Sequence, residues 1–217
     1  HGNFPCFLFL NHSFPMKNLK TMLGTTLNCN DYLSRLNSEL NRLDKDSINR
    51  WSDAIFAAWE GGNTVYIIGN GGSGTTASHF AEDLGKGSIP NDKFHDPDFK
   101  RLKVLSLTDN LGWIMALGND LSYDQIFVQQ LMNYASPDDL LIAISGSGNS
   151  PNILNAVKWA NENNVKTFGL TGYTGGQLKA MQQDGLHVEL DDMGMVESIH
   201  LAVFHWVLND FYRRVNL

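Results

Sequence analysis

The sequence predicts an α/β fold, a three-layer sandwich built around a five-stranded, mainly parallel sheet. Three observations predict it. Short apolar segments alternate with longer segments of helical spacing, and two of the apolar segments lead into loops rich in serine and glycine. The chain of 217 residues is long enough to bury one full core and too short for two ordinary domains. Strands that alternate with helices form a parallel sheet with helices on both faces.

Two helices are expected before the first strand. Residues 30–43 and 46–59 carry apolar side chains at the three- and four-residue spacing of an amphipathic helix. Asp44 or Asp46 is a suitable N-cap for the second helix because a carboxylate accepts hydrogen bonds from free N–H groups of the first turn.

The rest of the chain alternates between strands and helices. The expected strands are residues 64–68, 103–106, 140–144, 167–170 and 187–190. The expected helices among and after them are residues 75–84, 123–132, 151–163 and 196–215. The polar, proline-containing segment 88–101 is expected to be a surface loop, and a lid is the alternative.

The first strand leads into a glycine-rich loop. Its residues are Gly69, Asn70, Gly71, Gly72, Ser73 and Gly74. Glycine allows a backbone to approach a ligand closely, and the helix that follows presents free N–H groups to an anion. The loop has neither the Gly-Lys-Ser/Thr of a Walker loop nor the G-x-G-x-x-G of a dinucleotide site. It therefore predicts a site for a phosphate or a sugar, with no nucleotide cofactor.

A second strand, loop and helix unit repeats this pattern. Residues 140–144 lead into Ser145, Gly146, Ser147, Gly148, Asn149 and Ser150. Pro151 then suits the first turn of a helix, where its missing N–H costs nothing. Three serine hydroxyls can surround a phosphate, and a flexible linker is the poorer interpretation because strand and helix flank the loop tightly. Ligands of parallel sheets bind at the carboxyl ends of the strands, where both loops are expected.

The motifs GNGGS, HFAED, SGSGNS, TGYTGG and ESIHLAVFH occur in this order and resemble the sugar-isomerase (SIS) domain of the phosphoheptose isomerase group. The resemblance implies an SIS-type, flavodoxin-like fold and a single domain over residues 16–217, with the N-terminal helices included. Residues 1–15 are expected to be a tag or an upstream extension, with Met16 as the native start. Their apolar run lacks the basic region of a signal peptide, and a membrane anchor is the alternative.

The resemblance also assigns roles to individual residues. Those matched to substrate binding are Asn70, Gly71, Gly72, Ser73, Asn119, Asp120, Ser145, Gly146, Ser147, Ser150 and Glu197. Asp83 matches the catalytic base and His205 a catalytic histidine that can also bind metal. His79 matches a metal ligand, so that the expected zinc set is His79, Asp83, Glu197 and His205.

Three positions depart from the family pattern. Asp83 replaces a glutamate, which withdraws the carboxylate by roughly 1.5 Å, and a misplacement of ~1 Å can cost ~10²-fold in rate. Glu197 replaces a glutamine and adds a negative charge that favours a cation. Gly146 replaces a threonine and removes at most one hydroxyl contact.

The chemistry of these residue types agrees with the resemblance. Aldose–ketose isomerisation needs one group to take a proton from carbon and a second group to serve the oxygen. A positive charge near the developing oxyanion helps, and zinc accepts both imidazole nitrogen and carboxylate oxygen. A lone histidine on an apolar helix face is usually a packed core residue, and this is the expectation for His200. The resemblance alone favours catalysis for His205.

Three functions remain open. The best supported is a phosphosugar isomerase that interconverts ketose and aldose phosphates, with sedoheptulose 7-phosphate as substrate. The second is a non-catalytic sugar-phosphate-binding or regulatory SIS protein, which has no chemical need for His79 and His205. The third is an amino-sugar phosphate lyase or etherase, which would be expected in a longer chain with two SIS units.

Composition limits the partners. The net charge of −7 does not favour nucleic acid or an anionic membrane surface, and no apolar run approaches the ~20 residues of a membrane span. Cys6 and Cys29 give no disulfide framework, which favours a reducing cytoplasm.

A phosphorylated sugar and further copies of the chain are therefore the expected partners. The resemblance implies a homo-oligomer, a tetramer. A physical motive is the apolar surface that Trp51, Ile55, Phe56 and Trp59 would add to a monomer.

Overall fold

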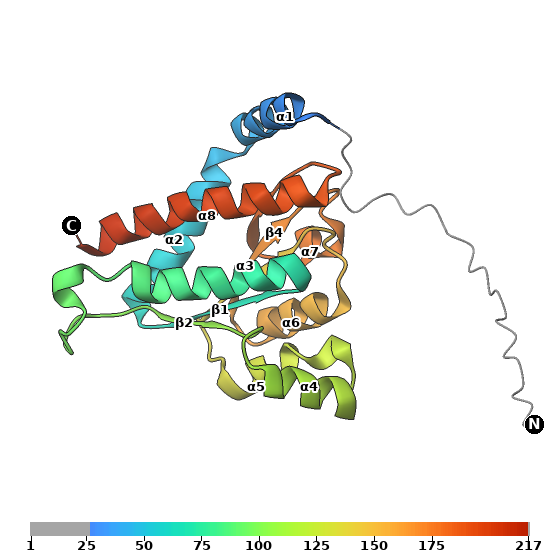
Figure 1. Cartoon of the computed structure of the whole chain (residues 1–217). Helices are drawn as coiled ribbons and strands as arrows, with labels where there is room; N and C mark the ends of the chain where they lie inside the picture. Colours follow the sequence, from blue (N-terminus) through green and yellow to red (C-terminus); the bar gives the residue numbers. More distant parts are fainter. Residues whose placement is uncertain (1–26, 217) are drawn as a thin grey trace, which may run out of the picture.

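A parallel sheet forms the middle layer of the computed structural model, which describes residues 27–216 (Figure 1). Its strands are β1 (Thr64–Gly69), β2 (Lys103–Ser106), β3 (Leu140–Ser145), β4 (Lys166–Thr171) and β5 (Asp184–His187). All four neighbouring pairs are parallel, in the order β2-β1-β3-β4-β5, which confirms the predicted five-stranded sheet. The expectations for residues 1–15 and Met16 lie outside the described residues.

Helices cover both faces of this sheet (Figure 1). They are α2 (Lys45–Gly61), α3 (Gly71–Glu82), α4 (Leu111–Asp120), α5 (Val128–Tyr134), α6 (Pro151–Glu162), α7 (Gly176–Met181) and α8 (Met193–Asn216), whereas α1 (Cys29–Arg42) packs against α8 away from the sheet. Asp44 is the N-cap of α2 and accepts a hydrogen bond from Asp46 N at 3.0 Å, which decides between the two expected caps. No helix within residues 27–216 is both long enough and apolar enough to span a membrane.

The core consists of two buried clusters, one on each face of the sheet. On the face covered by α2, α3 and α8, Trp51 stacks on Phe168 with ring centroids 5.8 Å apart. Trp51 and Ile55 are fully buried in this cluster, and Phe56 and Trp59 pack against it. The proposed motive for oligomerisation was therefore wrong for these side chains, because α8 already covers them within the same chain.

Three expected elements differ from the structure. The fifth strand begins at Asp184 rather than at residue 187, because Asp184–His187 is the segment that pairs with β4. The helix expected at 123–132 is divided into a 3₁₀ turn, Tyr123–Gln125, and α5. Helix α3 begins at Gly71 rather than at residue 75, so the glycines form its first turn.

Candidate active site

The first Ser/Gly loop is a direct turn from β1 into α3. Asn70, in an extended conformation, is the N-cap, and Gly71 follows with a φ of 54°, which favours glycine. A side chain at Gly69 would collide with the backbone of Ser73, so the strand and the first helical turn approach as closely as glycine allows. The free N–H groups of this turn point beyond the carboxyl end of the sheet.

The second loop lies beside the first because β1 and β3 are neighbouring strands. Ser145 ends β3, Ser150 is the N-cap of α6, and Pro151 occupies the first turn as expected. Ser145 Oγ lies 3.5 Å from Ser150 Oγ. Gly148, with a φ of 66°, makes the tight bend between them.

The two loops line a cavity of about 290 Å³. Its lining residues include Asn70, Gly71, Gly72, Ser73, Ser145, Gly146, Ser147, Ser150 and Glu197. The structure therefore brings together nine of the eleven residues expected to bind substrate. A side chain at Gly146 would collide with Met193 Sδ, so Met193 fills the space that a threonine side chain would need.

Glu197 reaches this cavity from α8. A Cβ on Gly72 would lie 2.6 Å from Glu197 Oε1, so only glycine at position 72 leaves room for the carboxylate. Burial raises the pKa of Glu197 above its ordinary value.

A cluster of titratable side chains lies further along α3. Asp83 Oδ2 is 3.1 Å from His79 Nε2 and 3.8 Å from His205 Nε2. One ligand atom from each of the three residues lies within 4.8 Å of the others, a geometry that can hold a metal ion. Asp83 begins a π-helical turn, Asp83–Gly87, an irregularity frequent at functional sites.

Glu197 lies outside this cluster. Glu197 and His205 share a broad side of α8, but this does not bring their side chains together, because eight residues separate the two by about 12 Å along the helix axis. The expected four-residue metal set is thus divided. His79, Asp83 and His205 converge, and Glu197 joins the Ser/Gly loops.

Asn119 and Asp120 are also separate from the cavity. They end α4, are exposed, and bond to each other through Asn119 Nδ2 and Asp120 Oδ1 at 2.8 Å. Neither residue lines the cavity between the two loops.

The two histidines of α8 occupy opposite environments, as expected. His200 is 1% exposed and its Nε2 lies 3.3 Å from Thr171 O, which confirms the interpretation as a core residue. The side chain of His205 is 47% exposed and its ring lies 5.4 Å from that of His79. Phe204, which lies between His200 and His205 in the sequence, stacks on Phe80 in the core.

Local sequence patterns did not indicate a second, smaller cavity next to the N-terminus of α3. This cavity of about 250 Å³ is lined by Ser78, Thr108 and Tyr123, among others. Ser78 Oγ donates a hydrogen bond to Asp109, which follows Thr108 just beyond β2. The signal that could have indicated it is the Thr-Asp pair at the carboxyl end of a predicted strand.

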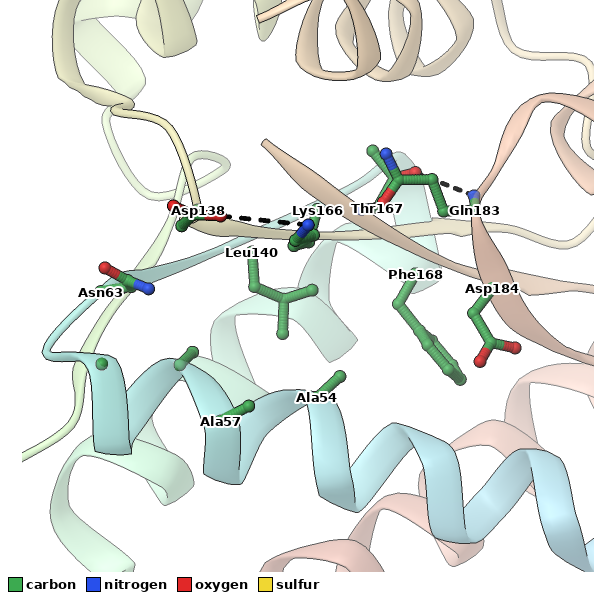
Figure 2. A pocket seen from close by; sticks show the side chains of 12 residues that line it. Ala54, Ala57, Asn63, Asp138, Leu140, Lys166, Thr167, Phe168, Gln183 and Asp184 are labelled. Carbon is green, nitrogen blue, oxygen red and sulfur yellow. Dashed lines mark hydrogen bonds and ion pairs between the residues drawn. The ribbon is translucent and has the colours of Figure 1, made fainter. Parts of the chain in front are cut away.

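A different cavity, of about 620 Å³, lies at the opposite end of the sheet (Figure 2). Leu140, the first residue of β3, points toward small residues of α2 such as Ala57, and Lys166, the first residue of β4, pairs with Asp138 at 3.9 Å. Parallel sheets bind their ligands at the carboxyl ends of the strands, whereas this cavity is at the amino ends. The Ser/Gly loops are therefore the better candidate site.

Comparison with known proteins decides the family. A family model described as the SIS domain matches residues 30–172. The chain belongs to the SIS domain family. It is 36% identical over 163 residues to the phosphoheptose isomerase of Aliarcobacter butzleri, covering 75% of this chain and 82% of that one. It is 35% identical over 156 residues to the probable phosphoheptose isomerase of Thermoplasma acidophilum, covering 72% and 82%.

Solved structures of this family have the same fold. A phosphoheptose isomerase from Francisella tularensis is similar with a TM-score of 0.76 and 28% identity, covering 85% of this chain and 96% of that one. The phosphoheptose isomerase of Neisseria gonorrhoeae has a TM-score of 0.75 and 25% identity, covering 83% and 93%. The resemblance to the phosphoheptose isomerase group and the predicted SIS fold are both confirmed.

Proposed function

We propose that this SIS protein is a phosphosugar isomerase that interconverts ketose and aldose phosphates, with sedoheptulose 7-phosphate as its substrate. The observation that carries the proposal is that His79, Asp83 and His205 converge near the C-terminal end of α3, the helix whose N-terminus lines the Ser/Gly cavity. Ser73 and His79 are six residues apart on α3, about 9 Å along its axis. This separation suits a ligand with a phosphate at one end and a carbonyl at the other. The names of the relatives support the substrate.

Different residues of the chain bind the phosphate and transfer the protons. Ser73, Ser145 and Ser150, with free backbone N–H groups, bind the phosphate and hold the sugar in one orientation. The Asp83 carboxylate takes the proton from the carbon next to the carbonyl. It then returns that proton to the former carbonyl carbon. His205 transfers the proton from one oxygen to the other, so that substrate and product carry the same number of protons.

The cluster of His79, Asp83 and His205 also fits a zinc ion. Two imidazole nitrogens and one carboxylate oxygen are ligands that zinc accepts, and three protein ligands leave a position open for substrate. Bound there, zinc would supply positive charge for an oxyanion.

A zinc titration tests this part of the proposal. Zinc should bind with one site per chain and should be released on acidification, because protons compete for imidazole nitrogen. His79→Ala should abolish that binding, whereas Glu197→Gln should leave it unchanged, because Glu197 lies outside the cluster. Equal loss in both variants would contradict the three-ligand site.

The proposed activity is tested by incubating the protein with a panel of ketose and aldose phosphates, with and without zinc. Sedoheptulose 7-phosphate should be converted to a heptose 7-phosphate, detected by nuclear magnetic resonance of the anomeric protons. Binding of a sugar phosphate without conversion under all conditions would instead support the regulatory alternative.

Replacing both Ser145 and Ser150 with alanine should weaken sugar-phosphate binding at least tenfold, about 1.4 kcal/mol. Hydrogen bonds to a charged phosphate are roughly twice as strong as neutral ones, and both hydroxyls face the cavity. Calorimetric titration measures the loss. Ser198→Ala is a matched control, because Ser198 Oγ is exposed and bonds only back to Gly194 O within α8. Unchanged affinity in the double variant would refute the phosphate site.

We propose a homo-oligomer, a tetramer, in the cytoplasm. The large exposed apolar side chains Leu111, Met115 and Leu121 of the α4 region support assembly, since no part of the chain within residues 27–216 covers them. Light scattering at micromolar concentration should give four times the chain mass of 24.2 kDa. Met115→Lys should lower that mass, and a monomer in the unchanged protein would refute the proposal.

A further inference from the structure

Two asparagine side chains join the Ser/Gly loops. Asn70 Nδ2 donates to Asn152 Oδ1 at 2.9 Å, and Asn152 Nδ2 donates back to Asn70 Oδ1 at 2.8 Å. Asn70 caps α3, and Asn152 belongs to the first turn of α6. The pair therefore connects the two helix N-termini that flank the cavity, across 82 residues of chain.

The backbone hydrogen bonds between β1 and β3 do not extend to these two helix N-termini. The register of β1 with β3 ends at Gly69 and Ile144, and the two chains then turn into separate helices. Asn152 is 2% exposed, and its Oδ1 also accepts a hydrogen bond from Ile153 N at 2.9 Å. Two reciprocal bonds between planar amides fix their separation and their relative orientation, so the spacing of the loops depends on Asn152.

The same pair limits what Asn70 can offer a ligand. Tyr123 Oη also donates to Asn70 Oδ1, at 3.1 Å, so both lone pairs of that oxygen are used. One N–H of Asn70 Nδ2 is directed to Asn152, and the second N–H remains. Asn70 lines the cavity, so its remaining capacity there is a hydrogen-bond donor, which suits the oxygens of a phosphate or a sugar.

We propose that Asn152 is a positioning residue of the ligand site. Asn152 sets the separation of the two loops. It also holds the Asn70 amide in the orientation in which the remaining N–H of Asn70 Nδ2 is available as a hydrogen-bond donor. This rests on the proposed function, since the ligand is taken to be a sugar phosphate. Without Asn152, the Asn70 amide keeps only the hydrogen bond from Tyr123 Oη, so it can rotate more easily and present its oxygen, which repels the oxygens of the ligand.

Asn152→Leu removes both bonds at nearly constant volume. The KM for sedoheptulose 7-phosphate and the Kd for inorganic phosphate should each rise about tenfold, and kcat should change less than about threefold. Asn163→Leu is the matched control at the C-terminal end of the same helix, because Asn163 Nδ2 donates back to Trp159 O at 2.8 Å, at the end of α6 that lies away from the loops. Its effect on KM should stay within about twofold.

A double-mutant cycle separates positioning from a structural role. In an Asn70→Ala background, Asn152→Leu should weaken phosphate binding less than about twofold further, because it acts through Asn70. An equal tenfold loss in both backgrounds, or a lower melting temperature with unchanged KM, would overturn the proposal. Tyr123→Phe, at an exposed side chain, provides a variant that should fold and should raise KM by about threefold.

A measurement without ligand keeps this proposal distinct from the proposed function. The side-chain amide signal of Asn70 in a ¹⁵N–¹H spectrum should shift in Asn152→Leu and stay in place in Asn163→Leu. An unchanged signal in Asn152→Leu would overturn the positioning role. Absence of phosphate and sugar-phosphate binding in the unaltered protein would count against the proposed function alone.

Discussion

His205→Ala is expected to abolish isomerisation of sedoheptulose 7-phosphate while phosphate binding stays within about twofold. His205 lies 3.8 Å from Asp83 and does not line the Ser/Gly cavity. A positioned acid–base group typically contributes ~10²–10⁴-fold, so kcat should fall at least ~100-fold. Steady-state kinetics measure the first quantity, and calorimetric titration with inorganic phosphate measures the second.

The same variant should leave the fold nearly unchanged. Because the His205 side chain is half exposed, its loss should change the free energy of unfolding by no more than about 0.5 kcal/mol. His95→Ala is the matched control, since His95 is exposed in the segment before β2 and belongs neither to the cluster nor to the lining of the Ser/Gly cavity. A lower melting temperature with retained activity would show that His205 is a packing residue.

Much of the fold could be predicted because local patterns of apolar residues determine where the strands and helices form. All six residues of β3 are buried, so a short apolar run marks the strand to within a residue. The fifth strand was misplaced because buried apolar residues continue past it. Val188 N still donates to Thr171 O, and Leu190 is buried, but neither belongs to the paired segment. Alternation alone does not show where pairing stops.

The candidate site was predictable where it depends on short spacings. His79 and Asp83 are one helical turn apart, and the structure places their side chains together. Glu197 lies outside the cluster that contains His205 because the two residues are far apart along the axis of α8. Their angular positions around the helix do not contain this distance. The contact of Met193 with Gly146 depends on tertiary packing between distant segments, and no local pattern indicates it.

Acidification should destabilise the protein through His200 in a defined window. Burial lowers the pKa of His200 to about 4, against ~6.5 for an unfolded chain. Between these values the unfolded chain binds a proton that the folded chain does not. The free energy of unfolding therefore falls as pH decreases from ~6.5 to about 4, by about 3 kcal/mol in all.

A comparison with His200→Gln isolates this contribution from that of the carboxylates. Glutamine can still donate to Thr171 O but does not titrate, so the variant should lose less stability on acidification than the unaltered protein. Urea denaturation at pH 7 and pH 5 should show roughly 2 kcal/mol less acid destabilisation in the variant, since each pH unit in the window is worth ~1.4 kcal/mol. His187, whose pKa burial also lowers, remains in both proteins and cancels in the difference. Parallel pH curves for the two proteins would mean that His200 binds a proton equally well when folded, and would contradict its burial as a neutral imidazole.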